Sequence, residues 1–296
     1  MPLSVAPVPY VEEEIRMRLS SLRWIARAAI AVTVMALLPA LAASPAQAAL
    51  VNTVTGSGGV VQIAPGASGH GVATCPSGKT AVGGGYDKQD SSILVDVSRP
   101  DGNGWRVHAW NTGSIALHIY PWVVCATVTG RVIANAAASV PAGISASATA
   151  ACPSGRRLTG GGFAFDTANG MASANPNITP VMNGPSGQGW KADAFNVTGV
   201  TRTIRSYAVC ATLPSNTIIG APGTIAPGQS PSIKANCPAG QVATGGGFAY
   251  GGANVRLEWF SVPGATTSPN NWWVFFKNTS PITFGVVVYA VCTPGT

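Results

Sequence analysis

The residue types that could perform acid–base or nucleophilic chemistry gather between residues 50 and 129. All three histidines of the chain occur in this stretch: His70, His108 and His118. Ser68 and four aspartates accompany them: Asp87, Asp90, Asp96 and Asp101. A Ser-His-Asp set for hydrolysis is therefore conceivable. No G-x-S-x-G elbow and no H-E-x-x-H motif is present, so the sequence gives catalysis little support.

Six cysteines form the strongest chemical pattern, because they recur in three copies of one motif. Each copy reads C-P-x-G-x4-G-G-G-[FY], then W-x5-N, then a second Cys fourteen residues after the Asn. The three copies comprise Cys75, Gly83–Gly85, Trp105, Asn111 and Cys125; Cys152, Gly160–Gly162, Trp190, Asn196 and Cys210; and Cys237, Gly245–Gly247, Trp272, Asn278 and Cys292. Constant spacing in three copies indicates three repeats of one fold.

Disulfides are the expected state of these cysteines. Six cysteines allow fifteen pairings, and the one that treats equivalent positions alike is Cys75–Cys125, Cys152–Cys210 and Cys237–Cys292. Closing a loop of roughly 50 residues should stabilise each repeat by about 4 kcal/mol. There is no C-x2-C, and copies two and three contain no histidine, so we expect neither a metal nor another cofactor.

Residues 1–48 are typical of a secretory signal peptide. Basic residues precede an apolar stretch at 28–43: Arg16, Arg18, Arg23 and Arg27. Ala46-Gln47-Ala48 is an A-x-A cleavage site, so the mature chain should begin at Ala49. Translation could begin at Met1 or Met17. The alternative, an uncleaved anchor, is less favoured because the apolar stretch is shorter than the roughly 20 residues of a membrane span.

Composition limits the partners of the mature chain. Charged residues make up 9% of the sequence, with 17 Lys+Arg against 10 Asp+Glu, and they are scattered. A nucleic-acid surface needs clustered basic residues, so nucleic acid is not expected as a partner. No second apolar span follows the signal, so we expect a secreted, extracellular protein with no membrane span after cleavage. The sequence leaves its oligomeric state open.

Alternation of apolar and polar residues predicts antiparallel strands within each repeat. The stretches 105–110, 190–195 and 272–276 each have one apolar face. In the third copy the opposite face is Trp273, Phe275 and Lys277, and we expect a neighbour to cover it. Segments 117–127, 203–212 and 285–293 are rich in β-branched and aromatic residues. Pro121 inside the first of them predicts an edge strand or a bulge.

These patterns predict an all-β fold. We expect three tandem disulfide-stapled antiparallel β-sandwich-like modules, packed on each other, after an N-terminal signal helix. The module boundaries are 49–129, 130–214 and 215–296, with five to seven short strands in each. Only short turns separate the modules, so they should pack together rather than hang as separate beads. Linear and pseudo-threefold packing both remain open.

The repeated glycines, tryptophans and asparagines have structural explanations. The triple glycine is not a phosphate loop, because no Gly-Lys-Ser/Thr follows it and a strand, not a helix, begins there. Glycines within a strand pattern indicate a bulge or a close approach, and we expect the tryptophan of each module to pack over this bare backbone. The tryptophan should lie in the core and the asparagine in a turn. An aromatic binding platform is the alternative role for the tryptophans.

Only the segment between the triple glycine and the tryptophan varies in length between copies. We interpret 87–104, 164–189 and 249–271 as recognition loops on a constant frame; drift in an unconstrained surface loop is the alternative. The candidate ligand-binding residues are Lys88, Asp96 and Arg99 in the first segment, Asn169, Asn175 and Asn177 in the second, and Arg256, Glu258, Trp259 and Phe260 in the third. Further candidates for stacking on sugar rings are Trp110, Tyr120, Trp122, Tyr250 and Trp273.

The repeat resembles a family of secreted bacterial proteins, often from high-GC actinobacteria, with C-P-x-G…G-G-G…W…N…Y-A-V-C-A modules. Tyr207-Ala-Val-Cys210-Ala and Tyr289-Ala-Val-Cys292 match that pattern, whereas the first copy has Trp122-Val-Val-Cys125. The resemblance implies an exported β protein and transfers no activity and no functional residues.

The function expected from the sequence is therefore binding without catalysis. We expect a secreted β-repeat protein that binds a glycan or a cell-surface protein at the envelope or in the medium. Two alternatives stay open. One is a secreted hydrolase with its site in the first module, and the other is a secreted inhibitor or structural coat protein.

Overall fold

Strands alone form the regular structure in the part of the chain that the computed structural model describes, residues 51–166, 178–251, 255–264 and 269–295. The all-β class is confirmed, while the expected signal peptide and its helix lie outside these residues. No helix within the described ranges is long and apolar enough to cross a membrane.

The first repeat supplies seven of the described strands: β1 (Val51–Ser57), β2 (Val61–Ile63), β3 (Ser68–Thr74), β4 (Thr80–Lys88), β5 (Ile93–Asp101), β6 (Gly104–Asn111) and β7 (Leu117–Thr127). The second supplies β8 (Thr129–Val140), β9 (Ser145–Ala151), β10 (Arg157–Asp166), β11 (Ile178–Pro185), β12 (Gly189–Asn196) and β13 (Arg202–Thr212). The third supplies β14 (Thr217–Ile225), β15 (Ser232–Asn236), β16 (Gln241–Tyr250), β17 (Val255–Pro263), β18 (Asn271–Asn278) and β19 (Phe284–Pro294).

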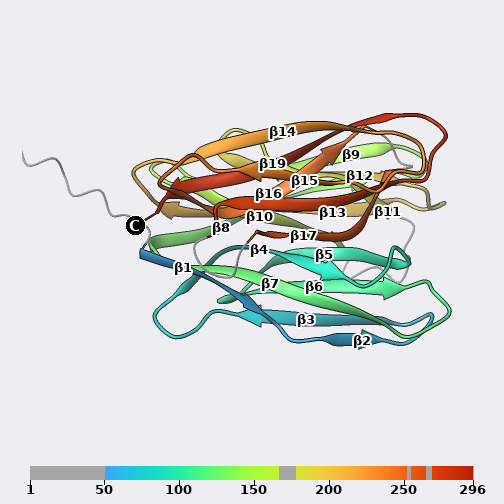
Figure 1. Cartoon of the computed structure of the whole chain (residues 1–296), viewed down its shortest axis with the longest axis horizontal. Helices are drawn as coiled ribbons and strands as arrows, with labels where there is room; N and C mark the ends of the chain where they lie inside the picture. The colour runs from blue at the N-terminus through green and yellow to red at the C-terminus, as the bar shows by residue number, and fades with distance from the viewer. Residues whose placement is uncertain (1–50, 167–177, 252–254, 265–268, 296) are drawn as a thin grey trace, which may run out of the picture. The chain divides into compact units, whose positions relative to one another are not determined.

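Each repeat is a two-layer sandwich whose layers belong to different sheets. Sheet I has the order β1-β7-β4-β17-β18-β15, with β2 also paired to β7. Sheet II is β3-β6-β5-β10-β13-β8, and sheet III is β14-β19-β16-β11-β12-β9. Figure 1 shows strands of different repeats side by side, such as β17 beside β4. Because each sheet joins a different pair of repeats, the pairing closes a cycle and the packing is pseudo-threefold.

The strands that join the repeats come from the segments of variable length. β5 pairs with β10, β11 with β16, and β17 with β4, all antiparallel. The interpretation of 87–104, 164–189 and 249–271 as loops is therefore wrong for most of their described length. These segments supply the backbone hydrogen bonds between repeats.

The first glycine of each triplet lies where the three repeats meet. A Cβ on Gly160 would come 3.0 Å from the Gly83 Cα, and a Cβ on Gly83 would come 3.1 Å from the Gly245 Cα. A Cβ on Gly83 would also overlap the carbonyl oxygen of Thr244. The neighbouring atoms are backbone and cannot move aside, so only glycine fits at this position.

The second and third glycines make two further close approaches. The second lies under the tryptophan of its own repeat: Gly84 under Trp105, Gly161 under Trp190 and Gly246 under Trp272. The third lies against a backbone carbonyl of the neighbouring repeat: Gly85 against Ser261, Gly162 against Ser98 and Gly247 against Asn183. A register shift just before the first glycine of each triplet adds the expected bulge. Both predictions for the triplet, close approach and bulge, are confirmed.

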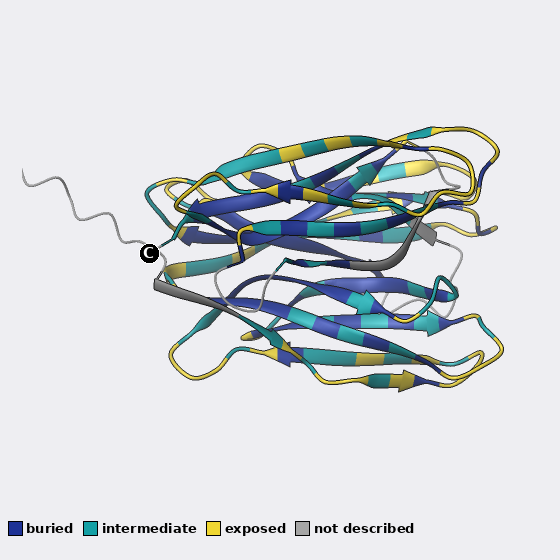
Figure 2. Cartoon of the chain, in the orientation of Figure 1, coloured by how far each residue is buried: buried dark blue, intermediate teal, exposed yellow. Residues whose placement is uncertain are grey.

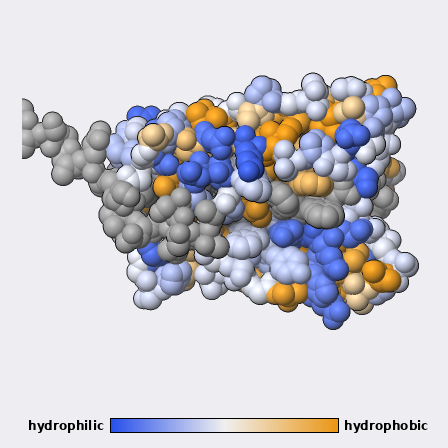
Figure 3. Space-filling view, viewed as in Figure 1, coloured by the Kyte–Doolittle hydropathy of each residue, from blue (hydrophilic) through white to orange (hydrophobic). Residues whose placement is uncertain are grey.

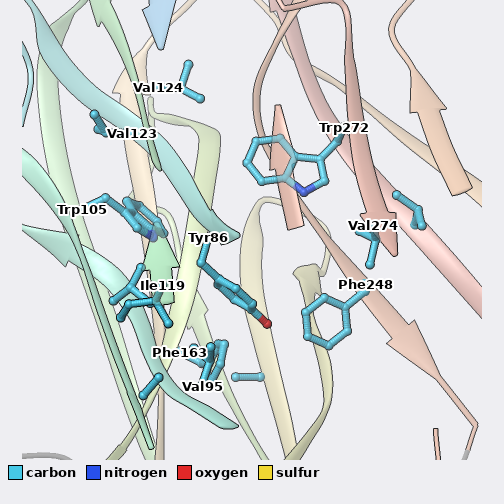
Figure 4. Close-up of a cluster of buried hydrophobic side chains, with 14 of the residues drawn as sticks. Tyr86, Val95, Trp105, Ile119, Val123, Val124, Phe163, Phe248, Trp272 and Val274 are labelled. Carbon is cyan, nitrogen blue, oxygen red and sulfur yellow. The ribbon is translucent and has the colours of Figure 1, made fainter. Parts of the chain in front are cut away.

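The three tryptophans are wholly buried and also bond to the joining strands. Trp105 Nε1 donates to Ser98 Oγ at 2.9 Å. In the same way Trp190 Nε1 donates to Asn183 Oδ1 at 2.6 Å, and Trp272 Nε1 donates to Ser261 Oγ at 3.0 Å. Figure 2 shows the alternation of buried and exposed residues along the strands. Figure 4 shows Tyr86, Phe163 and Phe248, which follow the three triplets, within a cluster of buried side chains.

The repeated asparagine closes the turn before the last strand of each repeat. Asn111 Nδ2 donates to the carbonyl oxygens of Ile63 and Ile115, and its Oδ1 accepts from Gly113 N. Asn196 and Asn278 repeat this arrangement in the other two repeats. A buried amide with all these partners fixes one turn conformation, so the predicted turn role is confirmed.

The three disulfides join the two layers of each sandwich. They are Cys75–Cys125, Cys152–Cys210 and Cys237–Cys292, as the repeat predicts. The first cysteine of each pair follows the first strand of one layer, and the second lies within the last strand of the other layer. Each bond therefore connects two different sheets.

Pro121 lies in an inner strand, so the prediction of an edge strand or a bulge is wrong. β7 pairs with β4 on one side and with β1 and β2 on the other, and its register with β4 is continuous where Tyr86 faces Pro121. Proline has no N–H to donate. This is tolerated because no residue of β1 or β2 pairs with Pro121: β1 ends at Ser57, opposite Trp122, and β2 begins at Val61, opposite Ile119. Gly58 N still donates to the Pro121 carbonyl oxygen at 2.9 Å.

Candidate functional site

The pseudo-threefold frame places six matched residues on the outer face of each sheet. Three come from the strand of the buried tryptophan and three from the last strand of a repeat. On sheet I they are Trp273, Phe275, Lys277, His118, Tyr120 and Trp122; on sheet II, Arg106, His108, Trp110, Thr203, Arg205 and Tyr207; on sheet III, Lys191, Asp193, Phe195, Gly285, Val287 and Tyr289. Gly285 is exposed and the others are half-buried, while their neighbours along the strand are mostly buried.

Sheet I differs from the other two in its aromatic content. Four of its six outer residues are Trp, Tyr or Phe, against two on sheet II and two on sheet III. The three sets occupy equivalent places in the fold, so the frame does not require these aromatic residues. We call the six residues of sheet I the aromatic face.

The rings of the aromatic face form two rows, and a carboxylate from β4 lies between these rows. β7 carries Tyr120 and Trp122, and β18 carries Trp273 and Phe275. β4 and β17 separate the two rows, which places them about 14 Å apart at ordinary strand spacing. Asp87 of β4 pairs with Tyr120 and therefore lies on the same face.

Two charged groups modify this face. Burial raises the pKa of the Asp87 carboxyl above its ordinary value, although a hydrogen bond from the Lys88 backbone N–H partly opposes that shift. The Lys234 ammonium lies over the ring of Trp273, with Nζ 3.5 Å from the ring centroid. The face therefore combines apolar rings, a hydrogen-bond acceptor and a cation.

On the side of the molecule seen in Figure 3, hydrophobic and hydrophilic residues are interspersed.

The candidate residues of the first variable segment all have partners within the protein. Lys88 is buried and its Nζ donates to the Ile93 carbonyl oxygen at 2.6 Å. Arg99 lies over the Tyr207 ring, 5.5 Å from its centroid, on sheet II. Asp96 is also buried on sheet II. The structure therefore places Lys88 in a strand of sheet I and the other two on sheet II.

The candidates of the other two segments fall largely outside the described residues. The backbone of Arg256, Glu258, Trp259 and Phe260 lies in β17, where Phe260 pairs with Asp87, but their side chains are outside the described part. Asn169, Asn175 and Asn177 are outside it altogether. Tyr120, Trp122 and Trp273, considered from sequence only as possible stacking residues, are brought onto one sheet face.

Asp96 and His108, named from the sequence among the residues of a conceivable Ser-His-Asp set, form a carboxylate–imidazole cluster with Trp110 on sheet II, a contact that the sequence analysis did not predict. His108 Nδ1 lies 2.6 Å from Asp96 Oδ1, and Trp110 Nε1 donates to Asp96 Oδ2 at 3.1 Å. Burial raises the pKa of Asp96, and the hydrogen bonds from His108 and Trp110 oppose that shift. The alternation of His108 and Trp110 along one strand was a usable signal. The contact with Asp96 was not predictable, because Asp96 lies at a register shift between Val95 and Val97.

The cluster is an incomplete hydrolytic site. Asp96 and His108 have the geometry of an acid that orients a base. Ser68 faces Trp110 in the register, but no hydrogen bond joins it to a histidine among the described residues. The described residues also contain no group of three or more His, Cys, Asp or Glu that could hold a metal ion. A positioned nucleophile is therefore lacking in the described part of the chain.

Comparison with known proteins adds no relative. No protein-family model matches the chain, and no curated protein matches it.

Proposed function

We propose that this protein is an exported, non-enzymatic protein that binds a glycan through the aromatic face of sheet I. The observation that carries the proposal is the concentration of Tyr120, Trp122, Trp273 and Phe275 on one of three equivalent faces. Half-buried aromatic rings that the frame does not require point to a binding role.

Sugar rings suit a face of this composition. Their C–H groups stack on aromatic rings, and their hydroxyls donate to acceptors such as the Asp87 carboxylate. Two rows of rings about 14 Å apart favour an extended chain of several sugar units over a single monosaccharide. Lys234 covers the Trp273 ring but is itself exposed, so a ligand displaces it at a cost of about 0.5–1 kcal/mol.

Export is supported by two features. Residues 1–48 have the pattern of a secretory signal. The three disulfides are typical of proteins that fold in an oxidising compartment. Both features suit a protein that meets polysaccharides outside the cell.

A depletion assay with insoluble polysaccharides tests the proposal. The mature protein is mixed with peptidoglycan, chitin or cellulose, and the unbound fraction is measured. We expect binding to at least one of them, and we expect Tyr120→Ala and Trp273→Ala each to weaken it about tenfold, which corresponds to about 1.4 kcal/mol. Phe195→Ala and Tyr289→Ala, at outer positions of sheet III, are the matched controls and should bind as the parent does.

Two results would overturn the proposal. One is the absence of binding both to these solids and on an array of soluble glycans. The other is an equal loss in the sheet I and sheet III variants, which would show that the aromatic residues act on folding. Thermal unfolding of every variant separates loss of binding from loss of structure.

A further inference from the structure

Two histidines face each other on sheet II, and only the first repeat has them. His70 of β3 pairs directly with His108 of β6. Their ring centroids are 6.5 Å apart, and the ring planes are inclined by 23°. The equivalent pairs in the other repeats are Ser147 with Asp193 and Ser232 with Phe275. The frame therefore does not require the histidine pair.

The contacts of His108 leave one ring nitrogen available. Trp110 Nε1 can only donate, and it donates to Asp96 Oδ2, so the buried Asp96 acts as an acceptor. When the Asp96 carboxyl is ionised it can only accept, so His108 Nδ1 donates the hydrogen bond to Asp96 Oδ1, 2.6 Å away. In this tautomer the Nε2 of His108 carries a free lone pair. A carboxylate that fixes the second nitrogen of a metal-ligating histidine is the usual outer contact of such sites.

His70 is free to move toward its partner. Its side chain is exposed and makes no hydrogen bond among the described residues. The nearest cationic side chain on β6 is Arg106, whose guanidinium is held by Asp101 at 2.8 Å. The charge of Arg106 is thus already paired, which lowers its repulsion of a cation near the histidines.

We propose that His70 and His108 bind a divalent transition metal such as Zn²⁺, and that Asp96 positions His108 for it. Neutral imidazole nitrogen is a preferred ligand of Zn²⁺, Cu²⁺ and Ni²⁺. Two protein ligands leave the remaining coordination positions to water or to a group from a partner. The site lies on sheet II and does not depend on the proposed glycan binding by sheet I.

Calorimetric titration of the mature protein with ZnCl₂ tests the proposal. We expect one Zn²⁺ per chain, with binding abolished in His70→Ala and in His108→Ala. His118→Ala is the matched control. His118 belongs to the same repeat but lies on β7 of sheet I, where its Nδ1 bonds to Gln89 Oε1 at 2.6 Å. Retention of binding in the His70→Ala, His108→Ala double variant would overturn the proposal.

The role of Asp96 has its own test. Asp96→Asn should weaken Zn²⁺ binding about 10- to 100-fold, the usual effect of losing such a contact. Imidazole resonances of His108 and His70 should shift on addition of Zn²⁺ in the parent protein, while those of His118 stay in place. Unshifted His70 and His108 resonances at saturating Zn²⁺ would also overturn the proposal. If Asp96→Asn fails to fold, the His70→Ala variant still tests whether the histidine pair binds the metal.

Discussion

Thr244 donates a hydrogen bond from its Oγ1 to the Thr159 carbonyl oxygen, 2.7 Å away, where the three repeats meet. Thr159 in turn donates from its Oγ1 to the Val82 carbonyl oxygen at 2.8 Å. The three residues are equivalent, because each precedes the first glycine of a triplet. Val82 has no hydroxyl, so the cycle of hydrogen bonds between repeats lacks its third member.

Val82→Thr should complete this cycle. The new hydroxyl would lie near the Thr244 carbonyl oxygen, and we expect the free energy of unfolding to stay unchanged or to rise by up to about 1 kcal/mol. Val107→Thr is the control, because that side chain is buried in the apolar layer of the first repeat. It should lower stability by about 1–3 kcal/mol. Urea unfolding measures both, and equal losses in the two variants would contradict the expected bond.

Gly83→Ala should destabilise the whole molecule. Its methyl group would overlap the Thr244 carbonyl oxygen and press on the Gly245 Cα. Backbone atoms of a central strand cannot yield, so we expect a loss of roughly 3 kcal/mol or more in urea unfolding. Gly285→Ala is the control: a Cβ there meets nothing within 4 Å, and the change should stay within about 0.5 kcal/mol. A loss as small as the control's would contradict the tight approach.

The sequence predicts the internal structure of each repeat better than the contacts between repeats. Constant spacing identifies the cysteine pairs, and alternation around Trp105 and its equivalents identifies the strands. β5, β11 and β17 each pair with a strand of their own repeat on one side and with a strand of another repeat on the other. Their segments differ in length and composition between the copies, so in the sequence they resemble loops.

The triple glycine nevertheless carries information about those contacts. One tryptophan per repeat explains one bare backbone position, as between Gly84 and Trp105. The other two glycines of the triplet indicate two more close approaches of the backbone. One repeat has no second or third tryptophan to explain them, so the triplet points to contacts with other repeats. The aromatic face is unpredictable for a similar reason: Tyr120 and Trp273 are far apart in sequence and lie in one sheet only because repeats one and three pair.

Removal of one disulfide should weaken all three repeats together. The Cys152→Ser, Cys210→Ser double variant loses the bond of the second repeat, and we expect a loss of about 4 kcal/mol. Sheets II and III contain strands of the second repeat and of both others, so unfolding should remain one transition at a lower denaturant concentration. Circular dichroism and tryptophan fluorescence should report the same midpoint. Two separate transitions would show that the repeats unfold independently.

The Asp87 carboxyl should make the protein less stable as pH rises above the ordinary aspartate range. Burial raises its pKa in the folded state, so the folded protein holds this proton more tightly than the unfolded chain does. The resulting loss in the free energy of unfolding is absent at pH values below the pKa of Asp87 in the unfolded chain. It reaches its full size above the pKa of Asp87 in the folded protein. Asp87→Asn should therefore raise stability at pH 7 by about 1 kcal/mol or less, since the group is partly solvated. The gain should vanish near pH 3.

Asp90→Asn is the control, because it should change the free energy of unfolding at pH 7 in the opposite direction to Asp87→Asn. Hydrogen bonds from Ser92, whose backbone N lies 2.7 Å from Asp90 Oδ1, lower the pKa of this carboxyl. Its contribution to stability is present above the unfolded pKa and is lost as pH falls through the folded pKa. Asp90→Asn should thus reduce stability at pH 7. Thermal unfolding between pH 3 and 7 follows both variants, and changes of the same sign would contradict the assignment.

Lys234→Ala should strengthen the binding of neutral glycans to the aromatic face. The Lys234 ammonium lies 3.5 Å from the Trp273 ring centroid and occupies a ring surface that a sugar would use. A cation–π contact at an exposed site contributes about 0.5–1 kcal/mol, so its removal should increase affinity roughly two- to fivefold. Lys191→Ala, which removes a lysine from sheet III, should leave affinity unchanged. Depletion assays on the same polysaccharide measure both variants. Weaker binding by Lys234→Ala would show that the ammonium itself contacts the ligand and would contradict the expected displacement of Lys234.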